Sequence, residues 1–149
     1  MTRTVTTAAL GLAAAALSLS SPALAQPQES VQTEAGALGL ETVVDGLVHP
    51  WGMAFLPDGR LLITEREGRL RLLSQDETLS ESLEGVPEVF NQGQGGLLDV
   101  ALHPDFASNR YVYLSFADPG SGGATTALGR GRLRDDRLED FEVIFRMEP

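Results

Sequence analysis

Short apolar runs separated by turn residues fill the chain from residue 40 onward. The run at 51–56 ends at 57–59 (PDG), where Pro fixes φ and Gly accepts a positive φ. The run at 60–64 (RLLIT) follows directly, so the two runs predict a β-hairpin. Residues 69–73 (RLRLL) mostly alternate polar and apolar side chains, which is typical of a half-buried strand.

The same pattern continues toward the carboxyl end of the chain. Residues 111–117 (YVYLSFA) are its most β-prone stretch, residues 103–109 are expected to form a turn, and 118–123 (DPGSGG) predicts a loop. After residue 25, no window of helical length has a clean apolar face with i, i+3, i+4 spacing. The chain is therefore expected to be all-β, with further strands at 40–44, 97–102, 127–133 and 141–145.

Part of this pattern occurs twice. Ala-x-x-Pro-Asp stands at 54–58 and again at 101–105, an offset of 47 residues. The strands that follow end in Thr64 and Ser115, an offset of 51, so the second turn is longer by four residues. Four-stranded units that repeat every ~40–50 residues predict a β-propeller, and the alternative is two unrelated hairpins that share a common turn.

The repeat predicts about two propeller blades, whereas a closed propeller needs roughly 4–8. Two blades alone leave sheet edges and half-buried faces exposed. Residues 40–149 are therefore expected to be a partial, truncated β-propeller that belongs to a longer protein.

Residues 1–25 have the composition of a secretory signal peptide. Arg3 precedes an apolar run at 8–17, helix-breaking residues follow, and Ala23-Leu24-Ala25 places small residues at −3 and −1 of a cleavage site. The alternative, a membrane anchor, needs ~20 apolar residues, about twice this run. The sequence predicts cleavage after Ala25, a periplasmic or secreted protein without a membrane anchor, and a flexible leader at 26–39.

Charge and cysteine content exclude several classes of function. The net charge is −10, and so acidic a chain is a poor ligand for nucleic acid or an anionic membrane surface. The absence of cysteine excludes disulfides, thiolate metal sites and cysteine nucleophiles.

The most unusual segment is 91–99 (NQGQGGLLD). Its glycines allow the backbone to approach a ligand closely, and the amide of Gln94 can both donate and accept hydrogen bonds. A plain loop between blades is the alternative, because loops favour these residues. His49 and His103 each precede a proline, which favours a turn position over a catalytic one.

The acidic residues offer no metal site by their spacing. The pairs at 135–136 and 139–140 lack the D-x-D-x-D-G order of a calcium loop, so a solvated hairpin is expected there.

Three segments carry a resemblance to a known family: 47–59 (LVHPWGMAFLPDG), 64–68 (TEREG) and 93–106 (GQGGLLDVALHPDF). Together they resemble the amino-terminal part of soluble PQQ-dependent sugar dehydrogenases, the glucose/sorbosone dehydrogenase family that includes the aldose sugar dehydrogenases. The resemblance runs from about residue 39 to 145. It implies a six-bladed β-propeller that holds PQQ and calcium over its channel. It also implies oxidation of the anomeric hydroxyl of an aldose, with hydride passing to PQQ and electrons to an external acceptor.

One residue of the family's site can be matched to a position in this chain. Gln94 matches the glutamine of the family's GQGG-like segment, which implies a polar contact in the sugar and quinone pocket. The family's catalytic histidine, its cationic cofactor residues and its calcium loop belong to positions beyond residue 149. The resemblance therefore assigns no catalytic residue and no metal ligand to this chain, which alone is expected to be inactive.

Two alternatives stay open at this point. One is a non-catalytic propeller that binds a sugar or a protein partner. The other is a short product without a function.

Overall fold

The computed structural model describes residues 29–148, and the chain divides into two units, 1–41 and 42–149. In the first unit, β1 (Glu29–Thr33) pairs antiparallel with β2 (Gly36–Leu40), and every residue of β2 is exposed. This hairpin spans residues 29–40 and occupies most of the stretch at 26–39 that was expected to be a leader. The predicted signal peptide, residues 1–25, lies outside the described residues.

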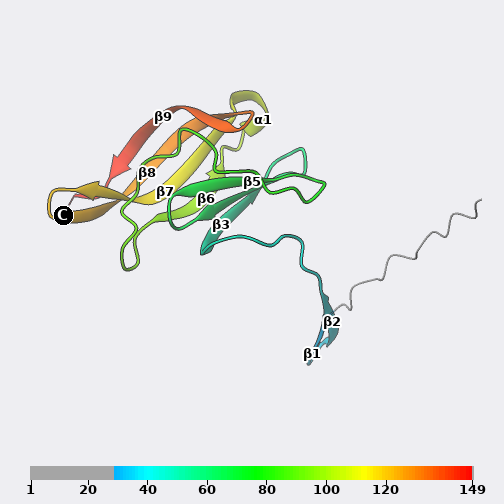
Figure 1. Cartoon of the computed structure of the whole chain (residues 1–149). Coiled ribbons are helices and arrows are strands. Elements are labelled where there is room, and N and C mark those ends of the chain that lie inside the picture. Colours follow the sequence, from blue (N-terminus) through cyan, green and yellow to red (C-terminus); the bar gives the residue numbers. More distant parts are fainter. Residues whose placement is uncertain (1–28, 149) are drawn as a thin grey trace, which may run out of the picture. The chain divides into compact units, whose positions relative to one another are not determined.

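The second unit holds two antiparallel sheets in which every strand pairs with its neighbour in sequence (Figure 1). Such a meander is what short strands joined by tight turns produce. The three-stranded sheet is formed by β3 (Pro50–Phe55), β4 (Leu61–Glu65) and β5 (Arg69–Leu73). The four-stranded sheet is formed by β6 (Leu97–Leu102), β7 (Tyr111–Gly120), β8 (Gly123–Arg134) and β9 (Arg137–Arg146).

The long hairpin of β7 and β8 corrects the expected loop at 118–123. Its register continues to Gly120↔Gly123, which leaves only Ser121 and Gly122 as the turn. Pro119 pairs with Ala124 within this extension. The strand expected at 40–44 is also wrong, because β2 ends at Leu40 and residues 41–47 form no strand.

The expected turn at 103–109 contains one turn of helix, α1 (Phe106–Asn109), which ends at Arg110 in the left-handed conformation (φ 61°). Phe106 is buried and anchors this turn to the core. Within residues 29–148, no helix is long and apolar enough to cross a membrane.

The core lies between the two sheets. Leu62 and Leu70 from the first sheet meet Val112, Leu114 and Phe116 from β7, all fully buried. Burying one such side chain contributes about 1.5–3 kcal/mol.

The strands β3 and β6 approach closely, since a Cβ at Gly52 would lie 2.6 Å from Oδ1 of Asp99. This contact fixes how the two sheets meet.

The repeat seen in the sequence is present in the strand register. In both sheets, the first hairpin pairs three residues in regular register and then shifts register toward the start of the strand. The matched pairs are Met53↔Ile63, Ala54↔Leu62 and Phe55↔Leu61 in one sheet, and Val100↔Leu114, Ala101↔Tyr113 and Leu102↔Val112 in the other. The offsets of 47 and 51 residues relate every one of these positions.

The hydroxyl residue that closes each repeated strand has the same structural role. A register shift leaves a backbone N–H without a ladder partner. Gly52 N donates to Oγ1 of Thr64 at 2.8 Å, and Asp99 N donates to Oγ of Ser115 at 3.0 Å. The alternative of two unrelated hairpins is therefore wrong, because the hydroxyl group that bonds the unpaired N–H at the register shift is repeated as well.

At the outer edge of the first sheet, an irregular segment takes the place of the fourth strand that the second sheet has. Residues 79–83 run beside β5, with Ser80 N bonded to Leu72 O and Leu83 N bonded to Leu70 O. Leu73 and Leu79 form an isolated bridge. The first repeat thus has three strands and an irregular edge segment, and the second has four strands.

Candidate functional site

The segment before β6 and the β4–β5 turn lie at the same end of the sheets. Leu97 N donates to Arg66 O at 2.9 Å, which joins the two sheets at this end. Phe90 N donates to Ala117 O at 2.8 Å, and Ala117 N donates to Gly96 O at 2.9 Å. Residues 91–96 are therefore attached both to β7 and to the neighbouring sheet.

Gln94 lies on this segment beside a surface hollow of about 300 Å³. The segment and the first residues of β8 face each other across the hollow, whose polar lining residues are Gln92, Gln94, Thr125 and Thr126. Amide and hydroxyl groups can donate and accept hydrogen bonds without carrying charge. Such a lining suits a neutral polyhydroxylated ligand or a carbonyl oxygen.

Glycines let the segment take its path. Gly93 has φ 57°, and a Cβ there would meet nothing within 4 Å. A Cβ at Gly95 would lie 2.3 Å from Phe90 O, so the backbone is closely packed at that position. Gln94 stands between a freely exposed glycine and a packed one.

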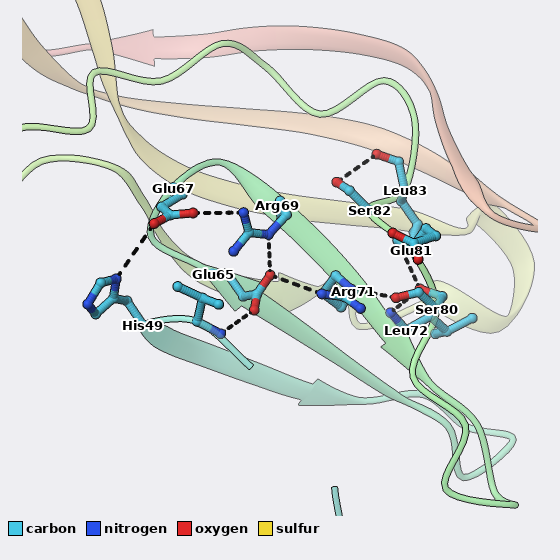
Figure 2. A network of polar contacts seen from close by, with 11 residues as sticks. His49, Glu65, Glu67, Arg69, Arg71, Leu72, Ser80, Glu81, Ser82 and Leu83 are labelled. Atoms are coloured by element: carbon cyan, nitrogen blue, oxygen red, sulfur yellow. Dashed lines mark hydrogen bonds and ion pairs between the residues drawn. The ribbon is translucent and has the colours of Figure 1, made fainter. Parts of the chain in front are cut away.

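A buried carboxylate lies at the base of the β4–β5 turn (Figure 2). Glu65 has no exposed surface, and its carboxylate accepts hydrogen bonds from Nε of Arg69 and from Val48 N, each at 2.5 Å. Nη1 of Arg71 lies 3.4 Å from the same carboxylate. Burial by itself would raise the pKa of Glu65, but these hydrogen bonds and the charge of Arg69 hold the pKa below its ordinary value.

The two histidines lie apart from each other and have local partners. His49 (φ 47°) is exposed, and its Nδ1 lies 3.9 Å from a carboxylate oxygen of Glu67 (Figure 2). His103 follows β6, at the opposite end of that strand from Gln94, and its Nδ1 accepts a hydrogen bond from Asp105 N at 2.9 Å. Six strand residues separate the two ends by roughly 20 Å, so His103 stabilises its turn and cannot act beside Gln94.

The acidic residues near the carboxyl end pair with arginines. Arg132 lies 3.3 Å from Asp140 and Arg134 lies 3.1 Å from Glu139, on the exposed β8–β9 hairpin. Across residues 29–148, no three acidic or histidine side chains come together as metal ligands.

Sequence reasoning missed Glu65 and Arg66 as structural elements of this end of the molecule. An acidic residue directly before a turn is normally exposed, and nothing local indicates that Arg69 and Arg71 on the next strand enclose it. The register of the β4–β5 hairpin could have indicated that Glu65 is paired. Glu65 pairs with Arg69 across β4 and β5, which places opposite charges side by side.

Comparison with known proteins agrees with this architecture. Residues 47–149 match the family described as glucose/sorbosone dehydrogenase. The aldose sugar dehydrogenase YliI of Escherichia coli is 49% identical over 116 residues, which cover 75% of this chain and 31% of that protein.

Two solved structures extend the comparison. A glucose dehydrogenase structure is 62% identical with a TM-score of 0.68, over 70% of this chain and 32% of that chain. The PQQ-bound aldose sugar dehydrogenase of Streptomyces coelicolor is 34% identical with a TM-score of 0.66, over 74% of this chain and 34% of that chain. The chain thus spans about a third of the length of these relatives.

These relatives are β-propellers, and the two sheets of the second unit are two of the blades. The resemblance inferred from the GQGG, TEREG and HPWG segments is confirmed by the match over residues 47–149. The chain belongs to the glucose/sorbosone dehydrogenase family of PQQ-dependent sugar dehydrogenases.

Proposed function

We propose that this chain is the amino-terminal part of an exported quinoprotein that oxidises the anomeric hydroxyl of aldose sugars. The observation that carries the proposal is the position of Gln94. It lies in the family's GQGG-like segment, beside an uncharged hollow lined by amide, hydroxyl and apolar groups, on a chain that belongs to the sugar dehydrogenase family. Relatives named as aldose sugar dehydrogenase and quinoprotein glucose dehydrogenase support an aldose as substrate.

The reaction removes a hydride from the anomeric carbon and a proton from its hydroxyl, and the electrons then pass from the cofactor to an external acceptor. PQQ supplies the hydride acceptor when it is bound. The residues that line the hollow suit one part of this reaction, which is holding the reacting groups in place. Gln94 can hold a sugar hydroxyl or a quinone oxygen by hydrogen bonds, and Thr125 and Thr126 offer hydroxyls across the hollow.

The remaining chemistry is assigned to residues outside this chain. A carboxamide is too weak a base to take up a proton near neutral pH, so Gln94 orients atoms and does not act as a base. We therefore place the base, the cationic groups that hold the cofactor and the calcium ligands in the remainder of the protein. Export rests on the signal-like residues 1–25, and amino-terminal sequencing of the exported protein should begin at Gln26.

A comparison of three preparations tests the proposal. The complete protein loaded with PQQ and calcium should reduce a dye in the presence of aldose, with saturation. Residues 1–149 under the same conditions should not exceed free PQQ. Saturable turnover by residues 1–149 alone would contradict the assignment of the base and cofactor residues to the remainder of the protein.

The third preparation is Gln94→Ala in the complete protein. Leaving a partner unpaired costs ~1–3 kcal/mol, so kcat/KM for the aldose should fall about tenfold or more. The melting temperature should change little, because Gln94 is exposed. An unchanged kcat/KM would refute the site, and a large drop in melting temperature would make Gln94 structural instead.

A further inference from the structure

The β4–β5 turn touches the end of the Gln94 segment, where Gly96 and Leu97 meet Arg66. Leu97 N donates to Arg66 O at 2.9 Å. A Cβ at Gly96 would lie 2.1 Å from that same oxygen and 2.6 Å from Cγ of Arg66. Gly96 also has φ 138°, a conformation that side chains rarely adopt. Both the contact and the backbone angle therefore require glycine.

The opposite side of the segment is held by the second sheet itself. Gly96 O accepts a hydrogen bond from Ala117 N at 2.9 Å, and Gly95 N donates to Gln92 O at 2.8 Å. Gln94 is thus followed by Gly95, which is bonded within the segment, and by Gly96, which is bonded to β7. A shift of Gly96 would therefore move the backbone that carries Gln94.

The turn that provides Arg66 is itself fixed. Arg66 N donates to His49 O at 3.0 Å, and Gly68 N donates to Glu65 O at 2.9 Å. The buried Glu65 carboxylate binds Arg69 and Val48, which ties the turn to the strand after it and to the segment before β3 (Figure 2). The turn is a rigid support because its backbone and its side chains are both bonded.

The guanidinium of Arg66 does not account for this contact. Within the described residues, its Nε is buried without a hydrogen-bond partner, which costs stability. What reaches Gly96 is the carbonyl oxygen and the first methylenes of the side chain. The contact is one of shape and backbone.

We infer that Arg66 is a positioning residue for Gln94: the first sheet holds the Gln94 segment of the second sheet in one conformation through Gly96. The inference rests on the proposed function, in which Gln94 contacts sugar or quinone. Because a displacement of about 1 Å in a positioned group can cost ~10²-fold in rate, a fixed segment is an advantage for the site.

A double-mutant cycle in the complete PQQ-loaded protein tests this. Gly96→Ala should lower kcat/KM for the aldose roughly tenfold or more, because the segment must move away from Arg66 O. In a Gln94→Ala background, the same change should cost about twofold or less, since residues that act through one another are not additive. Full additivity of the two losses would overturn the inference.

The matched control is Gly46→Ala. Gly46 also has a positive φ (84°), but a Cβ there would meet nothing within 4 Å. Its kcat/KM should equal that of the native protein. The control separates the strain of alanine at a positive φ from the contact with Arg66.

Amide hydrogen exchange gives a readout independent of activity. Gly96→Ala should speed exchange of the Leu97 amide, which loses its bond to Arg66 O, while exchange within β7 and β8 stays unchanged. Unchanged exchange at Leu97 would overturn the inference even if activity falls. If Gln94→Ala alone leaves kcat/KM unchanged, the proposed function fails, and the exchange result still decides whether the contact holds the segment.

Arg66→Ala is the second variant, in case Gly96→Ala does not fold. It adds no atoms and removes the Cγ that packs on Gly96, leaving the carbonyl in place. We expect faster exchange at Leu97 and a loss of about threefold to tenfold in kcat/KM that disappears in the Gln94→Ala background. A loss that persists there would show a merely structural role.

Discussion

At the residue scale, Glu65 shows how a charged side chain becomes part of a core. It is fully buried, yet both carboxylate oxygens have hydrogen-bond partners: Arg69 and Arg71 on one oxygen, Val48 on the other. An unpaired buried carboxylate would be costly, whereas a fully bonded one fixes geometry. Here it fixes the turn that carries Arg66.

Glu65 should make the protein less stable in acid. The pKa of Glu65 in the folded protein lies below its ordinary value of 4.5. Its stabilisation is therefore present above about pH 4.5 and is lost as pH falls through the folded pKa. Urea unfolding of the native protein and of Glu65→Gln, measured from neutral to acidic pH, should show a smaller acid loss in the variant.

At neutral pH, Glu65→Gln should cost about 1.5–3 kcal/mol, the value of hydrogen bonds to a charged group. Glu67→Gln is the matched control, because Glu67 pairs with the same Arg69 from the exposed surface and should cost no more than ~1 kcal/mol. Equal effects of the two substitutions would show that burial of Glu65 contributes nothing.

At the scale of the elements, the repeated hairpin is defined by its bulge and by the hydroxyl that compensates it. Thr64 also donates to Leu98 O at 2.5 Å, which links the two sheets, whereas Ser115 bonds Asp99 N on an exposed face. The two hydroxyls thus occupy equivalent positions with different surroundings.

The two positions should therefore respond unequally. Thr64→Val keeps the shape but leaves a buried N–H and a carbonyl unpaired, and should lower the free energy of unfolding by ~1–3 kcal/mol. Ser115→Ala should cost about 0.5–1.5 kcal/mol, because water can replace its hydroxyl. Chemical denaturation of both variants measures the difference, and a greater loss for Ser115→Ala would contradict this account of the repeat.

The sequence pattern located two strands correctly. Residues 69–73 and 97–102 form strands with the predicted bounds. The β7–β8 hairpin was underestimated because Pro and Gly in 118–123 disfavour strands, while the pairing of two long strands overrides this preference.

The candidate site was predicted only in part. Gln94 could be singled out by its glycine-rich surroundings and its resemblance to the family. The contact of Gly96 with Arg66 joins residues 30 positions apart, and no local pattern carries it. Pairing between sheets is a tertiary property, so this half of the site required the structure.

At the scale of the whole molecule, the outer side of β3 presents large apolar side chains to solvent. Trp51, Met53 and Phe55 alternate along the strand and are 53%, 67% and 73% exposed. The intervening Gly52 and Ala54 face the other sheet. Contiguous apolar surface of this kind promotes association.

Residues 1–149 in isolation should self-associate as concentration rises. Met53→Thr with Phe55→Thr should reduce this association, as measured by light scattering, because it removes apolar area from an edge strand. Val43→Thr is the control, since Val43 is also exposed but lies outside the strand. Trp51, the single tryptophan, should fluoresce as a solvent-exposed indole, and its emission should shift to shorter wavelength in the associated form. Association unaffected by the double substitution would show that another surface is responsible.

The contact at Gly96 also limits how this segment can change during evolution. The atom nearest to a Cβ there is a backbone oxygen of Arg66, so no change of side chain at position 66 can make room for a larger residue at 96. A second substitution at position 66 therefore cannot compensate for a larger side chain at position 96. Three residues before it in the sequence, Gly93 has a left-handed φ of 57°, which Asn and Asp tolerate, and a Cβ there would meet nothing within 4 Å. Diversity in this segment, natural or engineered, should therefore accumulate at position 93 while position 96 stays glycine.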